Sequence, residues 1–180
     1  MAALRKANSY SKRKVTPFTR VSKKRTKSFI KTLPPHKVVK FEMGKGSEYK
    51  AGKFPHLLRV ISLENIQIRH NAFEACRQYI NKKLDTELGG QYFFKIVPFP
   101  HHVQRENKML TGAGADRLQS GMQLSYGKSM NKAAIVKKGK RIFEIAVLNE
   151  KAVVFARAII KQVNPKLPGK IKVEYEKLSN

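Results

Sequence analysis

Apolar residues recur with helical spacing in two segments of the chain. The first helix is predicted to begin with Asn71 as its N-cap, with Glu74 at the capping-box position, and to end at Gly89-Gly90. Its apolar face consists of Phe73, Cys76, Ile80 and Leu84. The second helix starts after Asn149, ends at Asn164-Pro165 and has an apolar face made of Ala152, Phe155, Ala156, Ile159, Ile160 and Val163. We expect the larger residues on these faces to be buried against a sheet: Phe73, Ile80, Phe155 and Ile159.

The remaining apolar segments are short or alternate with polar residues, which predicts strands. Glycine and proline residues mark their ends, and a turn is expected at Lys45-Gly46-Ser47. Lys138-Gly139-Lys140 is expected to join two of the strands as a hairpin. The six predicted strands are Val38–Met43, His56–Leu63, Tyr92–Val97, Ala133–Lys137, Arg141–Val147 and Ile171–Tyr175.

The order of these elements predicts the α+β class, with two helices packed on one face of a mixed, mainly antiparallel sheet. We place a single domain of this kind at residues 38–177, and a basic arm at residues 1–37. The third and fourth strands are separated by a segment without readable periodicity.

This segment runs from His101 to Lys128, within a functional loop that we place at residues 99–131. It carries glycines at 112, 114, 121 and 127 with basic residues between them. Long loops without secondary structure are uncommon in compact domains and usually have a function. We therefore expect residues 101–117 to be irregular, to contribute little to folding and to form a contact surface.

The arm is strongly basic, and residues 1–40 contain no Asp or Glu. Such a block of like charge cannot bury enough surface to fold alone. We expect residues 1–30 to be extended or irregular, and to become ordered against a polyanion. The candidate binding residues are Arg5, Lys6, Lys12, Arg13, Lys14, Arg20, Lys23, Lys24, Arg25 and Lys27.

The whole chain of 180 residues shares this imbalance, with 38 Lys and Arg residues against 12 Asp and Glu residues and a net charge of +26. A nucleic acid is the partner that such a charge favours. An anionic membrane surface fits less well, because no basic amphipathic helix stands out. No apolar run reaches the roughly 18 residues of a membrane span, and the N-terminus lacks the apolar segment of a secretory signal.

The single cysteine, Cys76, excludes an intramolecular disulfide and a zinc site built from several cysteines. One thiol fits a reducing compartment. Because Cys76 lies on the apolar face of the first helix, we interpret it as a core thiol and not a reactive one.

Motifs that would indicate an enzyme are incomplete. Gly127-Lys128-Ser129 resembles the end of a phosphate-binding loop, but Met122 stands where that motif needs its first glycine. Gly112-Ala113-Gly114 lacks the third glycine of a dinucleotide fingerprint, because Arg117 occupies its place. We therefore expect no nucleotide cofactor.

Neither a metal site nor a catalytic residue is expected. His101 and His102 are adjacent and have no acidic or cysteine cluster to complete a metal site, so polar contacts to RNA or packing at a strand end are favoured. Glu106 and Asp116 could in principle be catalytic carboxylates. Because each is next to an arginine, local ion pairs that order the loop are favoured.

The loop also carries a specific resemblance. Its motifs resemble those of universal large-subunit ribosomal protein sixteen, whose archaeal form is large-subunit protein ten-e. The resemblance covers essentially the whole chain and extends to Arg69-His70-Asn71-Ala72 and Pro168-Gly169-Lys170. The motifs are Arg105-Glu106-Asn107-Lys108-Met109, Thr111 to Arg117, Gly121-Met122 and Gly127-Lys128.

The resemblance implies an α/β-hammerhead-like fold with a small barrel-like sheet. It implies binding to large-subunit rRNA between the central protuberance and the stalk base, near the aminoacyl-tRNA site. It also implies tRNA and neighbouring large-subunit proteins as partners, a location in the cytoplasm, and neither a membrane nor a homo-oligomer. The residues expected near tRNA are His101, His102, Arg105, Asn107, Lys108, Met109, Arg117 and Lys128.

The chain departs from the family pattern in two places. Gln123-Leu124-Ser125 stands where many members have Arg-Gly-Ala, and Ser129 stands where proline is frequent. The chain also ends soon after Lys177, without the C-terminal extension of eukaryotic members, so we expect the archaeal form.

Two other functional classes remain open at this level. One is a nucleotide-dependent RNA-modifying enzyme that uses the glycine-rich loop, which would bind free nucleotides. The other is a general double-stranded nucleic-acid binder, which would not prefer large-subunit rRNA over DNA. The resemblance favours a structural ribosomal protein, in which catalysis belongs to the RNA.

Overall fold

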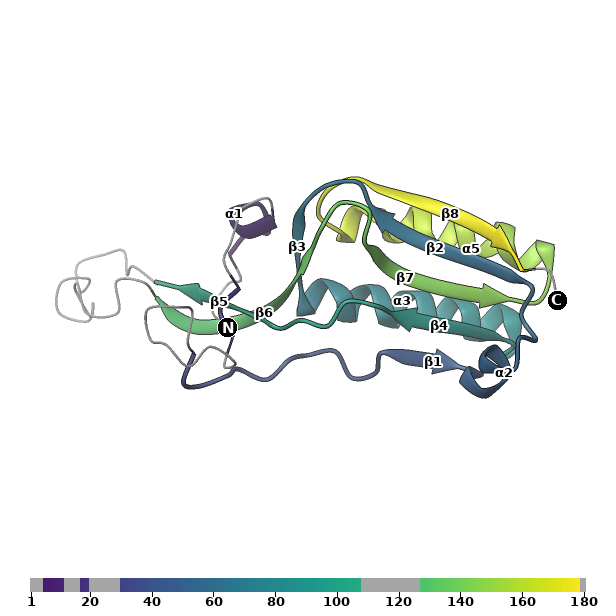
Figure 1. Cartoon of the computed structure of the whole chain (residues 1–180), viewed down its shortest axis with the longest axis horizontal. Helices are drawn as coiled ribbons and strands as arrows, with labels where there is room; N and C mark the ends of the chain where they lie inside the picture. Colours follow the sequence, from purple (N-terminus) through teal and green to yellow (C-terminus); the bar gives the residue numbers. More distant parts are fainter. Residues whose placement is uncertain (1–4, 12–16, 20–29, 108–126, 179–180) are drawn as a thin grey trace.

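The computed structural model describes residues 5–11, 17–19, 30–107 and 127–178. These residues form an α+β fold with two antiparallel sheets in place of the one that was predicted (Figure 1). The helices are α1 (Asn8–Ser11), α2 (Gly46–Lys50), α3 (His70–Leu88) and α5 (Glu150–Val163), with a 3-10 turn η1 at Asn164–Lys166. The strands are β1 (Glu42–Gly44), β2 (His56–Ser62), β3 (Ile66–Arg69), β4 (Tyr92–Ile96), β5 (His102–Glu106), β6 (Lys128–Val136), β7 (Arg141–Val147) and β8 (Ile171–Lys177).

The larger sheet has the order β1-β4-β7-β2-β8, and every pair of neighbours is antiparallel. Its central strand β7 pairs Ile145 with Leu58 on one side and with Phe94 on the other. These side chains are buried with Phe73 of α3, whose ring meets Phe143 edge to face at 6.2 Å. The prediction that two helices pack on an antiparallel sheet is therefore confirmed for this part.

The smaller sheet has the order β3-β6-β5, and β5 and β6 extend away from the main body (Figure 1). The sequence did not reveal β3, because its four residues lead directly into α3. It also predicted a loop over residues 99–131, and this was wrong for residues 102–106 in β5 and for residues 128–131, with which β6 begins. β5 is buried on both faces, so its sequence shows no alternation of apolar and polar residues.

The predicted hairpin of β6 and β7 was also wrong, since the two strands belong to different sheets. The turn between them is instead tied to the end of β2. Gly139 donates its N–H to the carbonyl of Ser62 at 2.8 Å, and Ser62 donates to the carbonyl of Lys140 at 3.1 Å. Asn65 accepts a hydrogen bond from the N–H of Lys138 at 2.9 Å. The connection from β2 to β3 and the connection from β6 to β7 therefore cross between the two sheets side by side.

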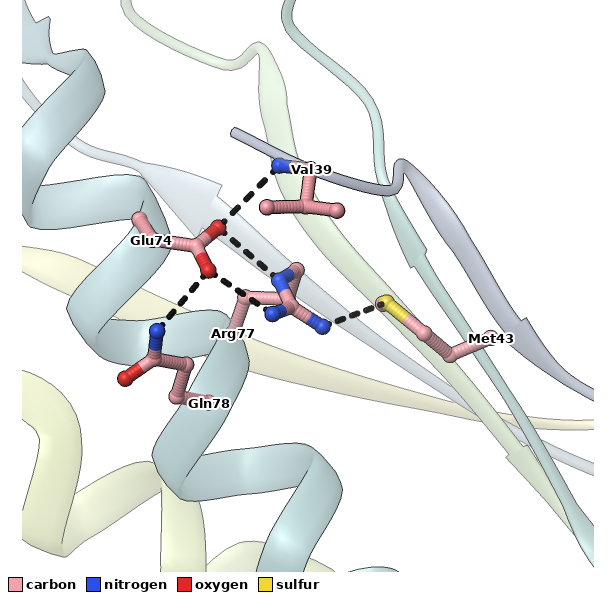
Figure 2. A network of polar contacts seen from close by, with 5 residues as sticks. All are labelled: Val39, Met43, Glu74, Arg77 and Gln78. Carbon is pink, nitrogen blue, oxygen red and sulfur yellow. Dashed lines mark hydrogen bonds and ion pairs between the residues drawn. The ribbon is translucent and has the colours of Figure 1, made fainter. Parts of the chain in front are cut away.

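The start of α3 differs from the prediction. Its N-cap is Arg69, and Asn71 already lies in the first turn, because β3 runs into the helix without a loop. Glu74 does not cap the helix but binds Arg77, Gln78 and the backbone N–H of Val39 (Figure 2). This holds the segment before β1 along α3, which explains why the strand begins at Glu42 and not at Val38.

The other ends of the helices agree with the sequence. Gly89 ends α3 with a left-handed φ of 52°, and Asn149 is the residue before α5. The apolar face of α5 is slightly rotated, because Val153 is buried and Phe155 is only partly buried. Ile80 and Ile159 are buried as predicted.

Cys76 is a core thiol, as the helical pattern predicted. It is buried within the main hydrophobic cluster. Burial raises the pKa of its thiol to about 12, so the thiolate is absent at neutral pH.

Candidate nucleic-acid interface

The N-terminal arm lies against the outer strand of the three-stranded sheet. Val103 of β5 donates its N–H to the carbonyl of Phe18 at 2.9 Å, and the N–H of Phe18 donates to Nδ1 of His102 at 3.0 Å. A third bond links Ile30 to Thr19 at 3.1 Å. Through Phe18, the arm thus continues the hydrogen bonding of the small sheet beyond β5.

A cation–π contact adds to this attachment. The guanidinium carbon of Arg105 lies 3.8 Å from the centroid of the Phe18 ring. Such contacts contribute about 0.5–2 kcal/mol, and the larger values apply where the contact is shielded from water. Arg105, predicted to contact tRNA, therefore also holds the arm in place.

The first part of the arm packs on β3. Arg69 donates from Nη2 to the carbonyl of Arg5 at 2.6 Å, and its guanidinium lies 5.4 Å from the centroid of the Tyr10 ring. The prediction that residues 1–30 are extended or irregular was wrong for residues 8–11, which form the single turn α1. Burial of the Tyr10 ring and a bond from the Ser11 hydroxyl to the carbonyl of Ala7 stabilise this turn.

Polar side chains are buried between the arm and the small sheet. Gln104 donates to Gln67 at 3.1 Å across the sheet, and both are buried. Glu106 is also buried, and burial together with this neighbouring carboxylate raises the pKa of Tyr10. The pairing of Glu106 with Arg105 stays a prediction.

The two adjacent histidines have different environments. His102 is only 4% exposed, and burial, followed by the charge of Arg105, lowers the pKa of its imidazole to about 4. It was predicted to be available for contacts with RNA, but it is buried, and its Nδ1 accepts the hydrogen bond from the backbone N–H of Phe18. His101 is exposed, and its ring lies 4.6 Å from that of Phe99.

Charge is distributed unequally between the two sheets. On the five-stranded sheet, basic residues pair with acidic ones: Lys95 with Glu42, Arg59 with Glu176, Arg141 with Glu144 and Lys172 with Glu174. The strands of the smaller sheet contain Arg69, Arg105, Lys128 and Lys132, and their single acidic residue is the buried Glu106. Arg5 and Lys6 of the arm are exposed nearby. The three-stranded sheet with its arm is therefore a cationic surface.

The predicted site residues fall partly inside the structure. Those described are Arg5, Lys6, His101, His102, Arg105, Asn107 and Lys128. Lys128 is exposed at the start of β6, and Asn107 follows β5. The predicted residues that lie outside the described part are Lys12, Arg13, Lys14, Arg20, Lys23, Lys24, Arg25, Lys27, Lys108, Met109 and Arg117.

The sequence interpretation missed the aromatic residues of this region. Tyr10 and Phe18 anchor the arm, and Phe99 is an exposed ring at the base of β5. The sequence could have indicated these residues, because each aromatic residue is close in sequence to basic or histidine residues. Aromatic rings interspersed with cations are a feature of RNA-binding surfaces.

The described residues hold neither a candidate metal site nor a helix that could span a membrane. They contain no group of three or more His, Cys, Asp or Glu side chains arranged to hold a metal ion. No helix within the same part of the chain combines the length and the apolar content needed to span a bilayer.

Comparison with known proteins gives a consistent family. The family described as "Ribosomal protein L16p/L10e" matches residues 16–174. Curated relatives carry the name "Large ribosomal subunit protein uL16". One from Methanococcus aeolicus is 39% identical over 95% of this chain and 93% of its own length. One from Staphylothermus marinus is 39% identical over 97% and 95%, and one from Hyperthermus butylicus is 43% identical over 80% and 78%.

Proposed function

This chain belongs to the ribosomal protein L16p/L10e family, in its archaeal form, and we propose that it is a structural protein of the large ribosomal subunit. In this role it is not an enzyme. It binds large-subunit rRNA in the cytoplasm, contacts neighbouring ribosomal proteins, and helps to position tRNA near the aminoacyl-tRNA site. The finer fold is the α/β-hammerhead-like arrangement of its relatives, with a basic arm and a long central loop.

The observation that carries the rRNA proposal is the unequal distribution of charge. The five-stranded sheet balances its basic residues with acidic partners, whereas the small sheet and the arm expose cations such as Lys6 and Lys128. Phosphates are the partners that compensate such a surface, and each phosphate contact releases a counterion. The rRNA therefore lies along the arm and the three-stranded sheet.

The loop between β5 and β6 is the part proposed to reach tRNA. β5 and β6 project from the body, and the segment that joins them in sequence carries the family motifs (Figure 1). In this loop and the strand ends that carry it, we propose that Arg105, Lys108 and Arg117 bind phosphates of tRNA, and that Asn107, Met109 and Lys128 complete the surface. His101 precedes β5 and lies away from the loop, so it is not part of this surface. His102 acts from within, by holding the arm through Phe18.

A sedimentation experiment tests the rRNA role. The protein is expected to remain with the large subunit after a high-salt wash, and to bind large-subunit rRNA more tightly than DNA of equal length. Deletion of residues 1–30 is expected to weaken binding and to flatten its dependence on salt, since each duplex phosphate contributes about 0.9 to the log–log slope. An unchanged slope after the deletion contradicts the role of the arm. Specific binding of free nucleotides would favour the RNA-modifying enzyme instead.

A second experiment tests the tRNA role separately. Large subunits are reconstituted with a Lys108→Ala, Arg117→Ala double variant, which keeps the contact between Arg105 and Phe18 of the arm, and are compared with an Arg157→Ala control on α5. We expect the double variant to enter subunits but to slow tRNA accommodation. Normal accommodation by subunits that contain the double variant contradicts the proposed contact with tRNA.

A further inference from the structure

A groove of about 360 Å³ lies at the base of the projecting strands. Its apolar part is formed by Val97, Pro98 and Ala134, and the exposed rings of Phe99 and His101 border it. Lys140, from the turn between β6 and β7, contributes a positive charge. Among the described residues, none of those that line the groove is acidic. The groove is therefore apolar inside and cationic at its edge.

The rings that border the groove are held in place from behind. Phe99 stacks on Phe41 with a centroid distance of 5.1 Å and an interplanar angle of 25°. His36 meets Phe99 nearly at a right angle, at 5.2 Å, and His101 lies against it at 4.6 Å. Phe99 keeps 39% of its surface exposed despite these contacts. The aromatic surface is thus fixed before any partner arrives.

Exposed aromatic rings beside cations suit one kind of partner. Unstacked RNA bases lie on aromatic side chains, and the phosphate that follows each base is attracted by a nearby lysine or arginine. The volume of the groove is within the roughly 300–1,000 Å³ typical of sites that enclose small ligands. An acidic peptide would satisfy Lys140 but would leave the flat ring of His101 without a matching surface. The combination of rings and charge therefore favours a nucleobase.

We infer that this groove binds one unstacked base of large-subunit rRNA, with the base against Phe99 and His101 and its phosphate near Lys140. This inference rests on the proposed rRNA-binding function and adds a specific contact to it. The contact is separate from the phosphate binding of the arm, because stacking involves the face of the base and few charges. The two contributions can therefore be measured independently.

The test uses full-length protein and full-length large-subunit rRNA. Phe99→Leu keeps an apolar side chain but removes the ring, and His101→Ala removes the second ring. Tyr175→Leu is the matched control, because Tyr175 is also 39% exposed but lies on the ion-paired five-stranded sheet. Binding is measured at several salt concentrations, and the chemical reactivity of each rRNA base is recorded with each variant bound at saturation.

We expect Phe99→Leu and His101→Ala to raise Kd by about 5- to 150-fold, the range found for loss of a stacked base. The salt slope should stay unchanged, and one unpaired base protected by the wild-type protein should become reactive. Lys140→Gln should instead lower the slope by about 0.7–0.9, as expected for one lost phosphate.

The inference is overturned if Phe99→Leu and His101→Ala bind as tightly as Tyr175→Leu and protect the same bases. If the wild-type protein binds rRNA and both variants behave as the control does, only the proposed base contact is contradicted. If the wild-type protein does not prefer large-subunit rRNA over DNA of equal length, the proposed function is contradicted as well. Thermal unfolding of each variant shows whether it is folded. If Phe99→Leu does not fold, the binding of His101→Ala alone tests the base contact.

Discussion

The imidazole Nδ1 of His102 accepts a hydrogen bond from the backbone N–H of Phe18 at 3.0 Å. The bond joins residues 84 positions apart and fixes the arm to β5. It requires a neutral ring, because a protonated imidazole has no lone pair to offer. Burial, followed by the charge of Arg105, lowers the pKa of His102 to about 4.

This histidine predicts a loss of stability in weak acid. Its folded-state pKa of about 4 lies below the ordinary value of 6.5, so the unfolded chain binds more protons between these values. The stabilising effect is complete above pH 6.5 and is lost as the pH falls towards 4, at up to about 1.4 kcal/mol per pH unit. Denaturant unfolding between pH 7 and pH 4.5 measures it.

The control is His102→Asn, whose amide oxygen can accept the bond from Phe18 but does not titrate. We expect this variant to lose less stability than the wild type over the same range. His70 is buried too, and burial, followed by the nearby charge of Lys37, lowers its pKa, so part of the acid loss should remain. Equal losses in the two proteins would show that His102 does not contribute.

Glu74 predicts a second effect of charge. It accepts hydrogen bonds from Arg77 at 2.9 and 2.7 Å, and this pairing lowers the pKa of its carboxyl group (Figure 2). We expect Glu74→Gln to cost about 1.5–3 kcal/mol at pH 7, the range for hydrogen bonds to charged groups. Glu87→Gln, on the exposed side of the same helix, should change stability by less than about 0.5 kcal/mol.

Urea unfolding measures this difference, and its pH dependence has a defined sign. Because the folded pKa of Glu74 is lowered, its effect is present above about pH 4.5 and is lost as the pH falls through the folded value. The cost of Glu74→Gln should therefore shrink in acid. A cost that stays constant with pH would mean that the charge of Glu74 is not what holds Val39 and Arg77.

We expect the loss of two phenylalanine rings from the core to lower the free energy of unfolding by different amounts. Phe73 is fully buried against Phe143, so Phe73→Ala should cost about 3–5 kcal/mol through the cavity that it leaves. Phe155 is partly buried, and Phe155→Ala should cost less. Thermal unfolding of both variants tests the order. Equal costs would mean that the ring of Phe155 is as deeply packed as that of Phe73.

Gly127 predicts a backbone effect at the end of the projecting strands. Its φ is +88°, and a Cβ atom there would lie 2.6 Å from the carbonyl carbon of Glu106. Gly127→Ala should therefore cost more than the roughly 1–3 kcal/mol of backbone strain alone. Gly52→Ala is the control, because its φ of +74° is similar but, beyond its two chain neighbours, no heavy atom of the described residues lies within 4 Å of the added Cβ.

Hydrogen exchange distinguishes where the Gly127 effect acts. We expect Gly127→Ala to increase exchange at the amides of β5 and β6, since these strands pair next to the altered residue. Protection in β7 should change little, because it belongs to the other sheet. Similar costs for Gly127→Ala and Gly52→Ala would show that the strands separate easily at this point.

The helices were predictable because a helical face depends on residues three or four positions apart. Cys76 and Ile80 are buried as the spacing required, and Gly89 ends α3 through its own left-handed conformation. Local chemistry of this kind is contained in a short window of sequence. The α+β class followed from the order of such windows.

The strands were less predictable, because each strand depends on what covers it. β5 contains polar residues such as Gln104 and Glu106 that are nonetheless buried, since the arm and the neighbouring strands enclose them. Its sequence therefore resembled an exposed loop. The hairpin of β6 and β7 failed for a related reason, because the Ser62 backbone holds their turn and separates the strands.

By itself, the sequence determined the net charge, the helical faces, the core position of Cys76 and the motifs of the family. Only the tertiary structure decided that the basic residues divide into a paired sheet and a cationic one, and that Phe99 and His101 share a groove with Lys140. The physical reason is range. Helix periodicity is local, whereas ion pairs, sheet order and the burial of His102 by Phe18 depend on segments that meet only when the chain folds.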